Sequence, residues 1–197
     1  MKAGFNGAAA VILAAAILYA MQRTTPLYSD IISPVPVAGE QGERIDTRAF
    51  ALGVGDVHLA RIVKTERFGR TRTYTTSGVW VLLEAAAEAS RESLTLTSAE
   101  WRGPSGVRYT LSQRFSTMPG MLPAERLEPG LPKPVLMAFE VPESELAGGT
   151  LLVAPSAFTP LGEEVQVAIT QLALGNIRSA VTIRQTGGPM PWVLGAE

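Results

Sequence analysis

Seven short stretches of this sequence are rich in apolar residues, and most of them alternate apolar with polar residues, the period of two that is typical of half-buried β-strands. Turn residues separate the stretches, as in Pro129-Gly130 and Gly148-Gly149. Strands that follow one another without intervening amphipathic helices favour antiparallel pairing over a parallel α/β sheet. The sequence therefore predicts a mainly β fold, an antiparallel β-sandwich, with strands near residues 57–63, 79–85, 94–97, 107–111, 135–141, 151–153 and 165–169.

The second of these stretches is apolar on both of its faces. Val79, Val81 and Leu83 would point to one side of a strand, and Trp80 and Leu82 to the other. A strand at the edge of a sheet, or with one face in water, does not need this pattern. We therefore expect residues 79–85 to form a central strand that is buried on both sides.

Composition limits what the domain can be. A chain of 197 residues has room for one core of ordinary size. The absence of cysteine excludes a disulfide scaffold, a thiolate metal site, a cysteine nucleophile and an acylated lipoprotein cysteine. The formal net charge of −1 is not the signature of a nucleic-acid-binding protein.

The first 23 residues contain a long uncharged run. From Ala3 to Gln22 there are 20 residues without a charge, and as a helix rising about 1.5 Å per residue they would cover roughly 30 Å, the thickness of a bilayer core. We expect residues 1–23 to be a transmembrane signal-anchor with a single pass through the inner membrane. The N-terminus would be cytoplasmic and the domain periplasmic or extracellular, an orientation that Lys2 favours and Arg23 opposes.

A cleaved signal peptide is the alternative interpretation of this segment. Its basic start would be Lys2, but signal peptidases need small residues just before the cut. A cut after Ala20 would place Leu18 three residues before the cleavage site. The spacing therefore favours retention of the segment.

The remaining sequence divides into three parts. Residues 24–49 contain Pro26, Pro34 and Pro36 without a regular apolar period, which predicts an extended stalk. We expect residues 50–185 to form the β-sandwich domain. Residues 186–197 predict a flexible tail, in which Trp192 is the side chain able to dock on another surface.

Several motifs of the domain resemble those of a known family. The motifs are Trp80, the segment Trp101-Arg-Gly-Pro-Ser-Gly-Val-Arg-Tyr109 with Ser112 and Arg114, Leu127-Glu-Pro-Gly130 and Phe139-Glu-Val-Pro142. Their order and spacing over about residues 50–170 resemble the telokin-like, immunoglobulin-type domain of bacterial exported proteins and lipoproteins, a family of largely unknown function. The resemblance implies an immunoglobulin-like sandwich that serves as an accessory or adhesion-like module, and it carries over no catalytic residue. The chain departs from the family in lacking the lipoprotein cysteine.

One constellation of charged residues follows the first predicted strand. Its cations and one aromatic ring would lie at a hairpin tip, where they could meet anionic lipid headgroups, a polysaccharide or an acidic protein surface. A solvated loop without a binding role is the alternative. The candidate binding residues are Arg61, Lys64, Arg67, Phe68, Arg70 and Arg72.

Candidates for catalysis or metal binding are few. His58 is the only histidine, and no G-x-S-x-G motif accompanies it. The carboxylate pairs Glu143 with Glu145 and Glu163-Glu164 lack the ligand density of a calcium loop. Gly53-Val-Gly55 begins a strand rather than a helix, so it is not a phosphate-binding loop. We expect no enzyme, no cofactor and no metal site.

These observations together predict a non-enzymatic interaction module that is anchored in the membrane and displayed in the periplasm. We expect it to bind a protein partner, as an accessory subunit of an envelope complex. The alternative is a domain that binds a polysaccharide or another anionic ligand through the basic hairpin of residues 61–72.

Overall fold

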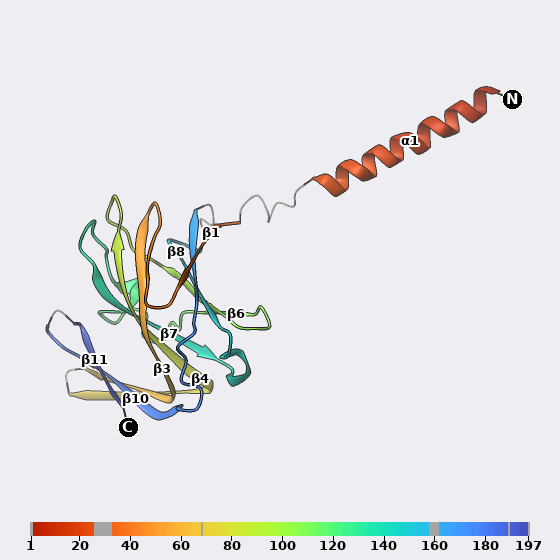
Figure 1. The fold of residues 1–197 in the computed structure, drawn as a ribbon. Helices are drawn as coiled ribbons and strands as arrows, with labels where there is room; N and C mark the ends of the chain where they lie inside the picture. Colours follow the sequence, from red (N-terminus) through yellow and green to blue (C-terminus); the bar gives the residue numbers. More distant parts are fainter. Residues whose placement is uncertain (1, 26–32, 68, 158–161, 189, 197) are drawn as a thin grey trace. The chain divides into compact units, whose positions relative to one another are not determined.

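The computed structural model describes residues 2–25, 33–67, 69–157, 162–188 and 190–196, with the backbone alone for residues 2–6, 8, 9 and 196. The chain forms two compact units, Met1–Ser33 and Pro34–Glu197. The first contains one helix and the second contains every described strand (Figure 1).

Helix α1 spans Lys2–Thr24. Its described large apolar side chains, which include Ile12, Leu13 and Leu18, are 52–70% exposed. Within the part of the chain that the structure describes, no helix has the length and apolarity needed to cross a membrane. The predicted transmembrane segment, residues 1–23, therefore gains no support from that part, and the side chains of its first six residues lie outside the description.

The second unit is a sandwich of two β-sheets. One sheet has the strand order β1-β9-β8-β5-β6, and the other has the order β11-β10-β3-β4-β7 with β2 paired to β3. Two short 3-10 helices flank β7, at Leu122–Ala124 and Glu143–Glu145. The strands are β1 (Val35–Glu40), β2 (Arg44–Asp46), β3 (Phe50–Arg67), β4 (Arg70–Ala89), β5 (Ser98–Arg102), β6 (Arg108–Thr110), β7 (Lys133–Val141), β8 (Thr150–Ala154), β9 (Glu163–Ala168), β10 (Arg178–Gln185) and β11 (Trp192–Ala196).

The prediction of a wholly antiparallel sandwich is wrong at two strand pairs. Strand β1 pairs with β9 in parallel, and β10 pairs with β3 in parallel. Parallel neighbours need long connections, and in both pairs the chain passes through several other strands before it returns. The sandwich itself is confirmed.

The predicted stalk and tail both contribute strands to the sandwich. Within the predicted stalk, residues 24–49, β1 pairs with β9, and Ile45 of β2 is buried. Pro36 lies on β1, an edge strand, where the missing N–H can be tolerated. Within the predicted tail, residues 186–197, β11 pairs with β10, and Trp192 is only 2% exposed. The sandwich therefore extends beyond the predicted bounds of 50–185 at both ends.

The expectation that residues 79–85 form a central strand is confirmed. Strand β4 lies between β3 and β7 and is apolar on both faces. Val79, Val81 and Leu83 join the core between the two sheets, whereas Trp80 and Leu82 join a second cluster on the opposite face. All five side chains are fully buried.

An irregular segment and the last strand cover that opposite face. Phe115 lies between β6 and β7 in the sequence, and its ring centroid is 5.1 Å from that of Trp80 and 4.9 Å from that of Tyr74. The Trp80 Nε1–H donates to the Tyr74 carbonyl oxygen at 3.2 Å. Met121 and Trp192 belong to the same cluster. The larger sheet is therefore packed on its outer face as well as on its inner one.

Candidate functional site

The basic hairpin forms, but its cations do not gather on one face. Directly opposed residues of antiparallel strands share a face, and the pairs are Arg67 with Arg70 and Thr65 with Arg72. Arg67, Arg70 and Arg72 thus lie on one face, and Lys64 lies on the other.

The two remaining members of the predicted basic site are Arg61 and Phe68, and the structure describes only the first. Arg61 sits where the register of β3 against β4 shifts, and its Nη2 donates to Glu143 Oε2 at 2.6 Å. Phe68 lies outside the described residues. Gly69 has a φ of 70°, in the left-handed region that a tight hairpin turn requires.

Strand β6 is an edge strand of only three residues. Two backbone hydrogen bonds join the ends of β5 and β6. The Leu111 N–H donates to the carbonyl oxygen of Ala99 at 3.2 Å, and the Gly103 N–H donates to that of Val107 at 3.0 Å. Hydrogen bonding alternates along an antiparallel pair, so the backbone groups of Arg108 and Thr110 face away from β5. These two residues are exposed, and their outward N–H groups lie at the edge of the sheet. Directly after them, an isolated antiparallel bridge joins Leu111 to Phe139 of β7 and closes this end of the edge.

A polar groove runs beside this edge. It consists of two adjoining hollows of about 460 and 430 Å³ that share Tyr109 and Glu140. Most of the lining side chains carry a hydroxyl, amide or charged group. They come from the irregular part of β4 (Thr76, Ser77), from β6 and the residues after it (Arg108, Thr110, Ser112, Gln113) and from β7 (Glu140).

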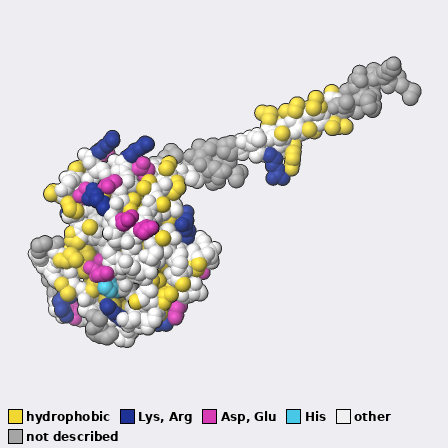
Figure 2. Space-filling model, viewed as in Figure 1, with side chains coloured by type: hydrophobic (Ala, Val, Ile, Leu, Met, Phe, Trp, Pro, Cys, Tyr) yellow, Lys and Arg dark blue, Asp and Glu magenta, His cyan; other side chains and the backbone are white. Residues whose placement is uncertain are grey.

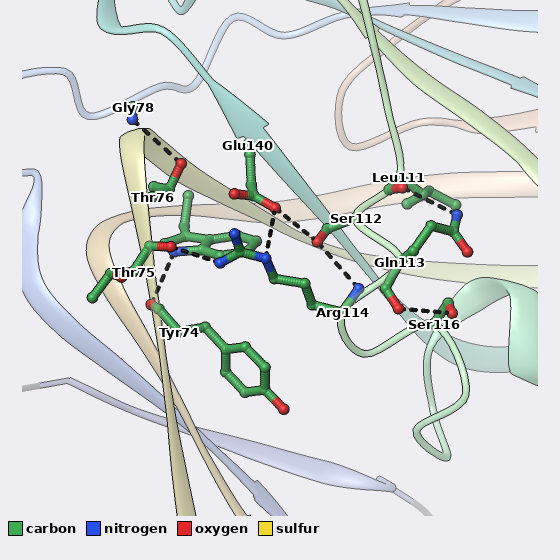
Figure 3. Close-up of polar contacts among 11 residues, drawn as sticks. Tyr74, Thr75, Thr76, Gly78, Leu111, Ser112, Gln113, Arg114, Ser116 and Glu140 are labelled. Atoms are coloured by element: carbon green, nitrogen blue, oxygen red, sulfur yellow. Dashed lines mark hydrogen bonds and ion pairs between the residues drawn. The ribbon is translucent and has the colours of Figure 1, made fainter.

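Hydrogen bonds hold the charged groups of this groove in place (Figure 3). The Ser112 hydroxyl donates to Glu140 Oε1 at 3.0 Å, and Arg114 Nε lies 3.5 Å from the same oxygen. Arg114 also donates to the carbonyl oxygen of Thr75 at 2.6 Å and stacks over the Trp80 ring at 5.6 Å. The carboxylate of Glu140 is therefore oriented and charge-compensated before any ligand arrives.

Gly78 lets β4 approach β7 at one end of the groove. A Cβ atom built on Gly78 would lie 2.4 Å from the Val141 carbonyl oxygen, closer than van der Waals contact allows. The Gly78 N–H donates a hydrogen bond to the Thr76 hydroxyl at 3.3 Å. Only glycine allows this close approach, which fixes the position of Thr76 and Ser77 in the groove.

The single histidine lies elsewhere, on the outer face of the larger sheet. His58 Nε2 is 2.7 Å from Glu84 Oε1, and the two side chains are 17% and 25% exposed. The exposed part of the histidine is the cyan patch in Figure 2. Glu84 is 26 residues from His58 along the chain, so nothing local in the sequence indicates this pair.

The predicted carboxylate pairs bond to protein groups. Glu143 binds Arg61, and Glu145 accepts from the Ser105 hydroxyl at 2.9 Å. Glu163 accepts from the Arg48 N–H at 2.6 Å, and Glu164 from the Gln166 amide at 2.8 Å. Among the described residues, no group of three or more metal-ligating side chains is found.

Comparison with known proteins gives the chain no family. No family model matches it, and no curated protein matches it. The chain is similar to a secreted protein from Mycobacterium tuberculosis, MPT63 (15% identity, TM-score 0.49, covering 70% of this chain and 100% of that one). It is also similar to the yjhA protein from Bacillus subtilis (12% identity, TM-score 0.48, covering 66% and 99%) and to an uncharacterized β-sandwich protein from Clostridium difficile (15% identity, TM-score 0.45, covering 70% and 95%). Similarity at this level assigns no function.

Proposed function

We propose that this protein is a non-enzymatic interaction module whose sandwich binds an extended segment of a protein partner along edge strand β6. The exposed edge at Arg108 and Thr110, directly beside the polar groove, is the observation that carries the proposal. An added strand would satisfy the outward backbone groups of β6, and its alternate side chains would enter the groove. The module would serve as an accessory subunit of an envelope complex.

The side chains of the groove support recognition rather than chemistry. Glu140 and Arg114 already neutralise each other, and the hydroxyls of Thr76, Ser77 and Tyr109 can both donate and accept hydrogen bonds. Polar groups of this kind fix the register of a bound strand, whereas the main-chain hydrogen bonds supply affinity.

Replacing Thr110 by proline tests the edge. Proline removes an N–H that faces away from β5, so the internal pairing of β6 is retained while strand addition loses a donor. We expect Thr110→Pro to abolish co-purification of the partner in mild detergent and Thr110→Ala to retain it. Both variants should keep the wild-type far-UV circular dichroism. Equal retention of the partner by a folded Thr110→Pro variant would sink the proposal.

Membrane anchoring by residues 1–23 is part of the same proposal, with the domain on the periplasmic side. The uncharged run from Ala3 to Gln22 and the exposed apolar side chains of α1 support it.

We expect the full-length chain to stay in the membrane fraction after an alkaline carbonate wash, and a variant that carries Leu13→Arg and Ile17→Arg to be released. Release of the unaltered chain would contradict anchoring.

Binding of an anionic polysaccharide by the basic hairpin is the second candidate function. The register of β3 and β4 favours it, because Arg67, Arg70 and Arg72 share a face. We also propose that the sandwich is of the immunoglobulin type, which the order of its sequence motifs supports.

Charge reversal tests the hairpin. If it binds polyanions, the double variant Arg70→Glu, Arg72→Glu should elute from an immobilised acidic polysaccharide at lower salt than the wild type. The matched control Arg91→Glu, Arg126→Glu carries the same net charge but leaves the hairpin unchanged. If the two double variants elute together, retention reflects net charge and the hairpin is not a binding site.

A further inference from the structure

A second groove, of about 490 Å³, lies on the outer face of the larger sheet, away from β6. Its floor is made of small residues of neighbouring strands, with Gly53 and Gly55 from β3 beside Ala86 from β4. Gly53 is directly opposite Ala86, so neither residue projects a long side chain. Pro134 of β7 and Trp192 of β11 also line the groove.

The charge around this groove is mainly negative. Glu43, Asp56 and Glu84 line it, and Arg44 is the one cation among the lining residues that the structure describes. That guanidinium is already engaged, because Arg44 binds Glu88 and also bonds to Asp46 at 2.9 Å.

The same partners keep Arg44 charged. The hydrogen bond to Glu88, followed by the one to Asp46, raises the pKa of Arg44 above its ordinary value. Arg44 therefore neutralises its own two partners. Among the described residues, the one charged contact of the groove carboxylates Glu43, Asp56 and Glu84 is that of Glu84 with His58.

Trp192 supplies an observation that is independent of the charge. Its indole Nε1 is buried and has no hydrogen-bond partner, the one such side-chain atom among the described residues. By contrast, the indoles of Trp80 and Trp101 donate to carbonyl oxygens of Tyr74 and Glu145. A buried N–H without an acceptor has lost its hydrogen bond to water and gained none in return, which costs free energy.

The indole of Trp192 is also part of the groove lining, so an acceptor bound there would lie beside it. Trp192 packs its Cε3 and Cζ3 atoms close to Gly120, where a Cβ would come within 2.8 Å or less of both. Nε1 is on the opposite side of the indole from these atoms, and the residue lines the groove.

We propose that this groove binds a lysine-bearing extended segment of a partner polypeptide. The ammonium group would lie among Asp56, Glu84 and Glu43, and a backbone carbonyl oxygen of the segment would accept the orphan N–H of Trp192. The negative charge of the groove favours the lysine ammonium. The small floor residues leave room for the backbone of the segment, and the indole N–H favours a ligand that offers a hydrogen-bond acceptor. This site is separate from the β6 edge, so either one can fail without the other.

Titration of the full-length chain with a tetralysine peptide tests the proposal. The three indole N–H groups give separate NMR resonances, and that of Trp192 can be assigned through its contact with Gly120. We expect tetralysine to shift the Trp192 resonance in a saturable manner and to leave those of Trp80 and Trp101 in place. Tetraglutamate and tetraglycine should produce no saturable shift.

Three variants locate the binding. The double variant Asp56→Asn, Glu84→Gln should weaken tetralysine binding about tenfold, because each exposed ion pair contributes a factor of about two to five. Gly53→Val should block the groove, because the valine side chain would stand on its floor. The variant should still fold, since a Cβ at this position meets the Glu43 carbonyl oxygen at an ordinary 3.5 Å and valine suits a strand. The control Glu92→Gln removes one exposed carboxylate outside the groove and should bind as the wild type does.

Several outcomes would overturn the proposal. They are the absence of a saturable Trp192 shift with tetralysine, an equal shift with either control peptide, and unchanged affinity in the double variant or in a folded Gly53→Val variant. Concentration-dependent shifts of Trp192 without any peptide, removed by Gly53→Val, would instead place a second copy of this chain in the groove.

Discussion

The burial of strand β4 on both of its faces is the constraint on which the rest of the structure depends. A strand with Trp80 and Leu82 on one side and Val79, Val81 and Leu83 on the other cannot leave either side in water. At roughly 25 cal/mol per Å² of apolar surface, two uncovered aromatic or leucine side chains would cost several kcal/mol. The outer face of the larger sheet therefore needs a cover, which the segment around Phe115 and Met121 and the indole of Trp192 provide.

This cover determines which surfaces remain open to partners. The segment that carries Phe115 leaves β6 and pairs with β7 on its way, through the Ser112 N–H and the Ala138 carbonyl oxygen at 2.8 Å. It thereby closes part of the edge of β7, bridges Leu111 to Phe139, and leaves the N–H groups of Arg108 and Thr110 at the exposed edge of β6. At the other end of the same face the cover stops at Trp192, and the floor of small residues beyond it forms the second groove.

The sequence predicted the strands whose alternation is local and strong. Strands β3, β4, β7, β8 and β9 follow the predicted runs, and the two-sided burial of β4 was readable because its apolar residues are consecutive. The run at 94–97 was misplaced: Leu94 makes an isolated bridge to Leu127, and the strand itself is Ser98–Arg102. Strands β1 and β11 escaped prediction because Pro36 and the glycine and proline residues before Trp192 resemble loop signals, which only the pairing with β9 and β10 overrides.

The candidate sites were less predictable than the strands. Glu140, Thr76 and Tyr109 come from three strands, and nothing local in the sequence shows that they meet. The same holds for Glu84 beside His58, and for the missing acceptor at Trp192. The basic hairpin was visible because its residues are close together in the chain, but the face on which each lies depends on a register that includes two irregularities.

Residue-resolved amide hydrogen exchange of the full-length chain, without any partner, tests the central claim most directly. The account places an open edge at β6 beside a sheet that is packed on both faces. It predicts slow exchange for Trp80, Leu82 and Leu111, and fast exchange for Arg108 and Thr110, whose N–H groups face away from β5. Protection of Arg108 and Thr110 equal to that of Leu111 would contradict it, because the edge would then already be occupied.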